Sequence, residues 1–435
     1  MSLATFKGGI HPPDKKKLSA ESPIQPTKPP QRVVIPLSQH TGAPAKPIVS
    51  IGQEVKKGEV IGNPEGFVSA TVHSSVSGKV IGIGEFPNAM GRMVNSIVIE
   101  NDGHETWVEL KEEPGYAQLS VDAIREKVRG GGIVGLGGAA FPTSVKLSPP
   151  KEKPIDTVIL NGAECEPYLT ADYRLMLEMP SEIVEGLRIL MKALGVNKGF
   201  IGIENNKPDA VKKMKEASTP YGNIDVCALE VKYPQGAEKM LIKALTDREV
   251  PPRGLPMDVS VLVQNVGTAF SIYEAVRFGK PLIERVVTVT GEGIKEPKNL
   301  MVKVGTMVSH LIEECGGFKN GSSKVVAGGP MMGFALYNLD VPVTKGTSGI
   351  LVMTEKEVIH VDVYKPCIRC GRCVDICPMG LMPSMLSVLS EAGHYEETKD
   401  YNLWDCFECG SCAYVCPSNR PIVQFVRLAK SMTKP

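Results

Sequence analysis

Short apolar runs of β-branched residues, separated by glycine and proline, dominate the chain from residue 33 to residue 101. Runs of this length, bounded by turn residues, are typical of short strands. We therefore expect a small all-β unit in this part of the chain. The expected strands are Arg32–Leu37, Val49–Ile51, Val60–Ile61, Val68–Val72, Lys79–Ile83 and Ser96–Ile99.

A second pattern, in which apolar runs alternate with segments of helical periodicity, extends from residue 121 to residue 285. Ser120 is expected to cap a first helix that continues through Arg129. Alternation of strands and helices predicts a largely parallel, layered sheet. The expected strands are Thr157–Leu160, Gly199–Ile203, Asp225–Leu229 and Ser260–Val263, and the expected helices are Ser181–Leu194, Lys207–Glu216, Gly236–Leu245 and Ala269–Phe278.

The chain becomes strand-rich again between residues 285 and 352, and it is helical and cysteine-dense from Glu355 onward. An amphipathic helix, Val308–Cys315, ends at a pair of glycines, and Gly328–Gly333 forms a loop, which together match a β-grasp-like unit. The proline-rich first 31 residues are expected to form no regular element and to be an extended arm. The strands expected in the β-grasp-like unit are Val286–Thr290, Met301–Val304 and Lys324–Ala327.

Charge and hydropathy narrow the class of protein. Lys plus Arg is 49 and Asp plus Glu is 48, so the net charge is +1, which excludes a bulk electrostatic nucleic-acid binder and gives no reason to expect a polybasic membrane anchor. No run of 18 apolar residues predicts a membrane span, and residues 1–13 lack a signal-peptide core. We therefore expect a cytosolic, reducing compartment, where clustered cysteines are metal ligands or catalysts.

Eight of the 11 cysteines belong to two copies of the motif C-x2-C-x2-C-x3-C-P. Three thiolates at this spacing bind three corners of one [4Fe-4S] cluster, and in two-copy proteins the fourth cysteine binds the other cluster. Two structural zinc sites are the alternative, but they usually have C-x2-C pairs set well apart. We expect Cys367, Cys370, Cys373 and Cys416 to bind one cluster, and Cys406, Cys409, Cys412 and Cys377 to bind the second. Cys227 and Cys315 are expected to be buried thiols.

A second candidate site begins in the glycine-rich segment from Arg129 to Lys146. Gly135, Gly137 and Gly138 allow the backbone to approach a phosphate closely, and Lys146 can supply the opposite charge. A glycine run alone is weak evidence because turns also need glycine, and no strand clearly precedes this one.

Polar residues that follow predicted strands strengthen this candidate site. Residues 161–167, with the sequence Asn-Gly-Ala-Glu-Cys-Glu-Pro, follow the strand Thr157–Leu160, and residues 233–239 and 264–268 occupy equivalent strand-to-helix positions. Open α/β sheets bind ligands at the carboxyl ends of their strands. For each acid taken singly, a surface or capping role remains the alternative.

These motifs together resemble those of the FMN- and NADH-binding subunit of respiratory complex I and of related hydrogenase diaphorases. The resemblance rests on Gly135–Lys146, Asn161–Pro167, Gly236–Glu238 and Asn265–Thr268. With the arm that begins Gly8-Gly9-Ile10-His11-Pro12-Pro13, the Gly328–Gly333 loop and the twin cysteine motif, the whole chain resembles the RnfC family, which belongs to membrane ferredoxin:NAD⁺ oxidoreductases called Rnf complexes.

The resemblance implies roles for ten residues in binding FMN and NAD(H). Gly135, Gly137, Gly138 and Lys146 would hold the FMN phosphate, Asn161 and Asn265 would contact the flavin or its phosphate, Phe141 would stack near the nicotinamide, and Glu164, Glu166 and Glu238 would line the nucleotide pocket. The chain departs from the diaphorase motifs at Ala163 and Ala237, where those motifs have acids, and after Lys146, where an aromatic residue is absent.

The segment from Gly52 to Gly78 resembles the lipoyl/biotinyl sandwich fold, in which a lysine on a hairpin tip is acylated. The matching position falls at about Ser69, so no swinging arm is expected and a structural or docking role is favoured. The whole chain is then a multidomain α/β and β protein. Its expected parts are an extended arm (1–31), a lipoyl-like barrel sandwich (32–105), an α/β FMN/NADH-binding domain (115–285), a β-grasp, SLBB-like domain (286–352) and a helical ferredoxin-like domain with two [4Fe-4S] clusters (353–435).

The resemblance implies an NAD-linked oxidoreductase with cofactor-borne chemistry and no catalytic side chain. The protein would be a peripheral subunit on the cytoplasmic side of the cell membrane, and its partners would be other subunits of a membrane redox complex, with a ferredoxin-type donor reached indirectly. Those subunits would couple electron transfer to ion translocation. Two alternatives are a soluble NADH dehydrogenase subunit of another redox complex and a flavin-free iron–sulfur electron-transfer adaptor, which Ala163 and Ala237 favour.

Overall fold

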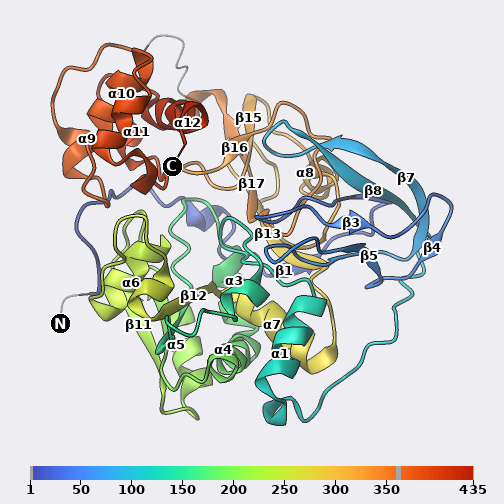
Figure 1. Ribbon diagram of the computed structural model, residues 1–435. Helices are drawn as coiled ribbons and strands as arrows, with labels where there is room; N and C mark the ends of the chain where they lie inside the picture. The colour runs from blue at the N-terminus through green and yellow to red at the C-terminus, as the bar shows by residue number, and fades with distance from the viewer. Residues whose placement is uncertain (1–2, 359–363, 435) are drawn as a thin grey trace.

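The computed structural model describes residues 3–358 and 364–434 (Figure 1). The first two residues of the expected arm, and residues 359–363 and 435 of the expected ferredoxin-like part, lie outside the described residues. The described chain forms four sheets and a helical C-terminal unit, which Figure 1 shows as the orange and red helices above the α/β domain.

Two small antiparallel sheets form the N-terminal sandwich. One has the order β2-β8-β7-β4, formed by β2 (Arg32–Pro36), β4 (Glu54–Val55), β7 (Gly78–Pro87) and β8 (Met93–Asn101). The other has the order β3-β5-β6, formed by β3 (Lys46–Pro47), β5 (Val60–Asn63) and β6 (Val72–His73). Alternate residues of both sheets, such as Val33, Ile35, Ile61 and Val80, share one core.

Two of the strands expected in the sandwich are wrong. Val49–Ile51 leads into a turn that is closed by a hydrogen bond from Gln53 N to Ser50 O (3.1 Å). In the segment Val68–Val72, only Val72 belongs to a strand, because the Ala70 N–H donates to the ring of His40 (3.1 Å) instead of to a neighbouring strand. These two apolar segments bury side chains without pairing with a neighbouring strand through a series of backbone hydrogen bonds.

The predicted parallel sheet of the α/β domain is confirmed. Its order is β11-β10-β9-β12, and every pair is parallel. The strands are β9 (Thr157–Asn161), β10 (Gly199–Glu204), β11 (Ile224–Leu229) and β12 (Val261–Asn265). The helices are α1 (Val121–Gly130), α2 (Thr143–Lys146), α3 (Ala171–Glu178), α4 (Pro180–Leu194), α5 (Pro208–Ser218), α6 (Glu238–Thr246) and α7 (Val266–Phe278).

Helices cover both faces of this sheet. Val158 and Leu160 of β9 belong to the large core with α4 and α7, whereas the intervening Ile159 packs in a second core with Leu241 of α6. The expected Ser120 cap is confirmed, since its hydroxyl accepts the Ala123 N–H (3.2 Å). Helix α3, which follows the 161–167 motif closely, is not among the helices expected from the sequence.

A six-stranded mixed sheet follows, with the order β1-β14-β13-β17-β15-β16. The helix α8 (Val308–Glu314) packs in its core. The strands are β1 (Ile24–Pro26), β13 (Glu284–Thr290), β14 (Lys298–Lys303), β15 (Ser322–Ala327), β16 (Phe334–Ala335) and β17 (Gly349–Thr354).

The expectation that the N-terminal arm forms no regular element is wrong. Lys16–Leu18 form a 3-10 turn, and β1 adds to the free edge of β14 in parallel register. An edge strand tolerates proline because only one of its sides is paired, so Pro26 can end β1.

The C-terminal unit consists of short helices. The one-turn helices α9 (Arg372–Asp375) and α11 (Ser411–Tyr414) belong to the two cysteine motifs, and α10 (Pro383–Glu391) packs against α12 (Ile422–Met432). The 3-10 turns Glu396–Tyr401 and Leu403–Asp405 complete it. None of the helices formed by residues 3–358 and 364–434 is both long and apolar enough to cross a membrane.

A buried lysine joins three parts of the molecule. The Lys345 ammonium group donates to the carbonyl of Thr71 in the sandwich (2.9 Å) and to that of Gly132 in the α/β domain (2.7 Å). The backbone N–H of Lys345 donates to Gln39 (3.1 Å) and its carbonyl accepts from Arg285 (2.5 Å). Burial lowers the pKa of Lys345 to about 7.

We expect Lys345→Met to destabilise the protein, because it leaves two buried carbonyl groups without a donor. Each such loss typically costs about 1–3 kcal/mol. In wild type, folding lowers the pKa of Lys345 from 10.5 to about 7, so the unfolded chain binds more protons between these values. The stability that this group contributes therefore rises with pH across that window.

Thermal unfolding of wild type and Lys345→Met between pH 6 and pH 10 measures this effect. The advantage of wild type in Tm should increase from pH 7 upward. Lys79→Met, at an exposed position, is the control and should show no such trend. An advantage of wild type that does not change with pH would contradict the prediction.

Candidate iron–sulfur and flavin sites

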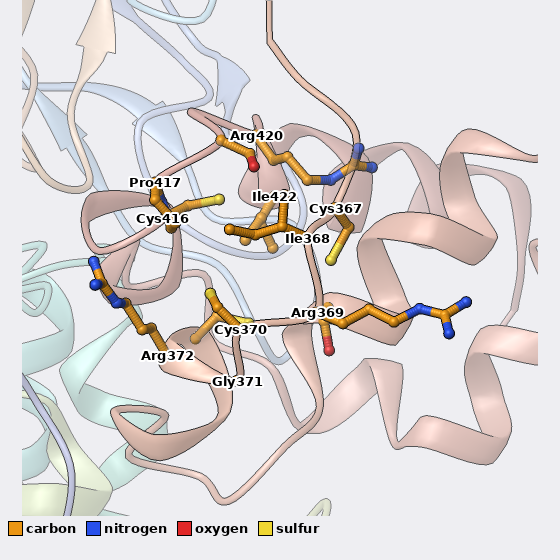
Figure 2. Close-up of a pocket in the computed structure, with 13 residues that line it drawn as sticks. Cys367, Ile368, Arg369, Cys370, Gly371, Arg372, Cys416, Pro417, Arg420 and Ile422 are labelled. Carbon is orange, nitrogen blue, oxygen red and sulfur yellow. The ribbon is translucent and has the colours of Figure 1, made fainter.

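Cysteines of both motifs line one pocket of the C-terminal unit. Cys367, Cys370 and Cys373 come from the first motif, and Cys416 is the last cysteine of the second. Figure 2 shows Cys367, Cys370 and Cys416 around a common space, whereas the side chains of Arg369 and Arg372 extend away from it. The structure therefore gathers the four cysteines expected to bind one cluster, which we call the first cysteine set.

The remaining four cysteines are also neighbours, and we call them the second cysteine set. Burial raises the pKa of the Cys412 thiol, and the nearby thiols of Cys406, Cys409 and Cys377 raise it further. These four thiols are therefore close to one another, and the cationic core of an iron–sulfur cluster would offset the repulsion between their thiolate forms. Cys377 thus leaves its own motif to join the other, as the crossed arrangement requires.

The loops that carry the two cysteine sets have the tight turns that a [4Fe-4S] cluster requires. Gly371 and Gly410 precede α9 and α11 with φ values of 79° and 82°, which favour glycine. The hydroxyl of Ser411 lies 3.4 Å from the Cys409 sulfur, and such polar groups near the ligands tune a cluster. Four thiols per set, on two tight glycine turns, fit two [4Fe-4S] clusters.

The glycine-rich segment folds over the start of α7, where β12 ends. Leu136 N donates to the Thr268 hydroxyl (2.9 Å), and Gly135 N donates to the carbonyl of Phe141 (2.9 Å). A Cβ atom added at Gly137 would lie 3.1 Å from Asn265, so a larger residue would crowd that side chain. At Gly138 an added Cβ would meet nothing within 4 Å.

Lys146 reaches the same edge of the sheet from α2. Its ammonium group donates to Glu238 (2.9 Å) at the start of α6 and to the carbonyl of Val263 (3.1 Å) in β12. Asn161, at the end of β9, donates to the carbonyl of Gly236 (2.8 Å). Asn265 caps α7 by accepting from Gly267 N (2.8 Å). Glycine N–H groups, one cation and two amides therefore meet at the carboxyl ends of β9 and β12.

The donors at this edge fit a phosphate-bearing ligand. The backbone at Gly138 faces open space, and the Lys146 side chain is a quarter exposed, at 27%. The buried amide nitrogens of Gln235 and Gln264 have no hydrogen-bond partner within residues 3–358 and 364–434. Buried polar groups normally have partners, so unpaired ones beside these loops are consistent with a polar ligand.

Glu164 and Glu166 bind backbone N–H groups of the protein itself. Glu164 accepts from Asp172 N (2.7 Å) and Tyr173 N (3.3 Å) at the start of α3. Glu166 accepts from Met331 N (3.1 Å) and Met332 N (2.8 Å) in the loop between β15 and β16. Burial raises the pKa of each carboxyl group to about 7. In this structure both acids hold loops in place.

Several residues at the site left no usable signal in the sequence. Lys16 of the arm donates to three carbonyl groups of the 164–169 loop, those of Glu164 (2.8 Å), Glu166 (3.0 Å) and Leu169 (2.6 Å). Asp172 accepts from the Asn265 amide (2.7 Å). Lys16 belongs to an ordinary lysine run, and only the structure distinguishes it from Lys15 and Lys17.

An α/β domain with a glycine-rich loop at its strand ends, joined to two four-cysteine sets, defines an iron–sulfur flavoprotein. Family models match four consecutive parts of the chain in this order. They are the RnfC barrel sandwich hybrid domain (4–104), the Nuo51 FMN-binding domain (128–274), the SLBB domain (286–335) and the 4Fe-4S dicluster domain (366–420). The predicted fold class, FMN and the two [4Fe-4S] clusters are thereby confirmed.

The chain belongs to the RnfC family, which is found in ion-translocating ferredoxin:NAD⁺ oxidoreductase complexes. The RnfC-family protein of the proton-translocating complex of Clostridium ljungdahlii is 52% identical, over 99% of this chain and 94% of the relative. That of the Na⁺-translocating complex of Acetobacterium woodii is 48% identical, over 98% of this chain and 96% of the relative. In Rhodobacter capsulatus, the corresponding protein of the ion-translocating complex is 44% identical, over 98% of this chain and 82% of the relative.

A solved structure shows the same fold at low identity. NAD⁺-reducing [NiFe]-hydrogenase in its H₂-reduced state matches 74% of this chain with a TM-score of 0.51 and 17% identity, and the match covers 64% of the hydrogenase chain. The structure of its air-oxidized state matches the same proportions of both chains, with a TM-score of 0.53. The hydrogenase therefore supports the fold, and the sequence relatives establish the family.

Alanine substitutions test the crossed cysteine sets. We expect about eight irons per wild-type chain and about four after loss of either cluster. Cys377→Ala and Cys409→Ala should remove the same electron paramagnetic resonance (EPR) signal, and Cys370→Ala and Cys416→Ala should remove the other. Cys227→Ala, in β11, is the control and should retain both. If Cys377→Ala removed the same signal as Cys370→Ala, the crossed arrangement would be wrong.

Proposed function

We propose that this protein is the peripheral, NAD-linked subunit of a membrane ferredoxin:NAD⁺ oxidoreductase, located on the cytoplasmic side of the membrane. Electrons from a ferredoxin-type donor would reach it through other subunits, which would couple the transfer to ion translocation, and the reaction would be reversible. The observation that carries the proposal is that one chain holds two sets of four neighbouring cysteines and an FMN-type α/β domain, which are in contact where the Tyr233 hydroxyl donates to the carbonyl of Cys409. The names of the Clostridium and Acetobacterium relatives support it.

The two cysteine sets lie in different surroundings, which suggests their order. The second set contacts the rest of the chain, since the carbonyl of Cys409 accepts from the Tyr233 hydroxyl (2.7 Å) and the carbonyl of Ile376, the residue before Cys377, accepts from Gly9 N (2.8 Å). Cys370 of the first set is exposed. We therefore place the first set toward partner subunits and the second toward the flavin domain.

The residues proposed to hold FMN are those at the carboxyl ends of β9 and β12. The N–H groups of Gly137 and Gly138 and the charge of Lys146 would bind the phosphate, and Gly135 would hold the phosphate loop in shape through its hydrogen bond to Phe141, while Asn161 and Asn265 would position the flavin. Phe141 would stack near the nicotinamide, and Glu164, Glu166 and Glu238 would line the nucleotide pocket, the first two through the loops that they hold. FMN, when bound, exchanges single electrons with clusters and a hydride with NAD(H).

The alanines that favoured a flavin-free adaptor have a structural explanation. Ala163 is fully buried in the core beneath α6, and an added Cβ at Gly236 would lie 3.4 Å from it. A larger side chain at this position would crowd the Gly236 turn. Ala237 precedes α6, and Glu238 is its first residue. These departures reflect local packing, and they leave Lys146, Asn161 and Asn265 in place.

Purified protein reconstituted with iron, sulfide and FMN tests the function. We expect bound flavin, and NADH should reduce both the flavin and an artificial acceptor such as ferricyanide. Cluster-containing protein that retains no flavin and oxidises no NADH would favour the adaptor. The protein could also oxidise NADH but fail to bind membranes that contain the partner subunits. That result would favour a soluble dehydrogenase subunit.

Lys146→Ala tests the phosphate site directly. The variant loses a charge-assisted contact, for which we expect about a tenfold weaker FMN affinity. Quenching of flavin fluorescence in a titration of the flavin-free protein measures the affinity. The control Lys153→Ala removes a lysine that pairs with Asp258 at a more exposed position. If the two variants bound FMN equally well, Lys146 would not contact the phosphate.

A further inference from the structure

Three residues from two distant parts of the chain contact the segments that carry the second cysteine set. Gly9 N donates to the carbonyl of Ile376 (2.8 Å), which precedes Cys377. Ile10 and Tyr233 exchange two backbone hydrogen bonds of 2.8 Å each. The Tyr233 hydroxyl donates to the carbonyl of Cys409 (2.7 Å). We call Gly9, Ile10 and Tyr233 the arm–tyrosine bracket.

The bracket reaches both motifs but only one cysteine set. Cys409 belongs to the second motif and Cys377 to the first, and the crossed arrangement assigns both to the second cluster. At Cys370, which corresponds to Cys409 in the first motif, the side chain is exposed. Contacts that served only to attach the C-terminal unit would not need to fall on the ligand segments of one particular cluster.

The two glycines of the arm are required by this contact. Gly8 and Gly9 have φ values of 84° and 81°. A Cβ atom at Gly9 would lie 2.7 Å from the carbonyl oxygen of Tyr233, and one at Gly8 would lie 3.0 Å from that of Ile376. A side chain at either position would therefore push the arm away from its partners. This explains the Gly8-Gly9-Ile10 segment, which the cofactor sites leave unexplained.

Tyr233 is held in a position from which its hydroxyl donates to the carbonyl of Cys409. Its side chain is only 1% exposed, and its backbone is fixed on both sides by Ile10. The carbonyl that accepts from the Tyr233 hydroxyl belongs to the peptide between Cys409 and Gly410. This peptide is planar and trans, so its N–H points opposite to its carbonyl. A carbonyl held toward Tyr233 turns the Gly410 N–H away from Tyr233. Gly410 itself is buried, and an added Cβ there would lie 3.1 Å from the carbonyl of Met331.

We propose that the arm–tyrosine bracket positions the second [4Fe-4S] cluster against the flavin domain and that the Tyr233 hydroxyl tunes its reduction potential through the Cys409–Gly410 peptide. Hydrogen-bond donors aimed at a cluster stabilise its reduced, more negative state and raise its potential. Tyr233 is a positioning residue, since it acts through the peptide of a ligand. The inference rests on the proposed function, because it requires two clusters and a flavin.

Redox titration of Tyr233→Phe, followed by EPR, tests the proposal in the reconstituted full chain. The variant retains the ring and loses only the hydroxyl. The signal of the second cluster, assigned by its loss in Cys377→Ala, should shift to lower potential, while that of the first cluster should not move. Tyr168→Phe is the matched control, because Tyr168 is also buried and donates its hydroxyl (2.6 Å) to Glu357. Tyr168→Phe should leave both potentials unchanged.

A second pair of variants tests the arm. Gly9→Ala should slow reduction of the second cluster by NADH in stopped-flow measurements, with no change in the rate of flavin reduction. Gly52→Ala is the control, because Gly52 has a similar φ of 92° but an added Cβ there would meet nothing within 4 Å. Flavin and iron contents equal to those of wild type show that each variant has folded.

The outcomes separate this inference from the proposed function. If wild type holds two clusters and an NADH-reducible flavin, but Tyr233→Phe leaves the potential of the second cluster unchanged, the tuning is overturned. If Gly9→Ala also transfers electrons as wild type does, the positioning is overturned as well. Wild type that has no NADH-reducible flavin would instead refute the proposed function. Equal shifts of both clusters would show a general structural effect and would also overturn the inference.

Discussion

Buried side-chain donors that reach main-chain carbonyl groups of distant segments hold the cofactor loops of this protein in place. Loops at strand ends lack ladder partners for their carbonyl groups, and a buried carbonyl without a donor is costly. One lysine ammonium group offers three donors on a long stem. Lys16 satisfies three carbonyls of the loop after β9, and Lys345 satisfies one carbonyl in the sandwich and one in the glycine-rich segment. Burying these lysines lowers their pKa values, and the burial is tolerable because each amino group fixes several carbonyl groups at once.

This kind of contact also explains what the sequence could not predict. The parallel sheet was predictable, because buried strands form apolar runs. The two clusters were predictable from the spacing of the cysteines along the chain, and the crossed ligation stays a prediction. A carbonyl partner leaves no trace in the sequence, since every residue carries one. Lys16, Tyr233 and Lys345 therefore resembled ordinary residues, and the arm that carries Lys16 was expected to form no regular element. For the same reason, the N–H partners of Glu164 and Glu166 could not be foreseen.

The two copies of the cysteine motif differ in their tertiary contacts. The local turns are alike, with Gly371 and Gly410 in nearly the same conformation. Their surroundings differ, because an added Cβ at Gly371 would meet nothing within 4 Å whereas one at Gly410 would lie 3.1 Å from the carbonyl of Met331. A relay needs one cluster that partners can approach and another that is fixed near the flavin. Sequence repetition supplies two similar cysteine motifs, and the fold then gives them different surroundings.

Glu166 connects these two regions physically. It follows β9, the strand that ends in Asn161, and its carboxylate accepts the N–H groups of Met331 and Met332. Met331 in turn packs against Gly410 of the second cysteine motif. Burial raises the pKa of Glu166 to about 7, so the carboxylate is held at a cost that its two N–H donors offset only in part. An apolar residue would avoid that cost but could not bind two backbone donors. The acid is therefore explained by the loop that it fixes between the flavin domain and the second cluster.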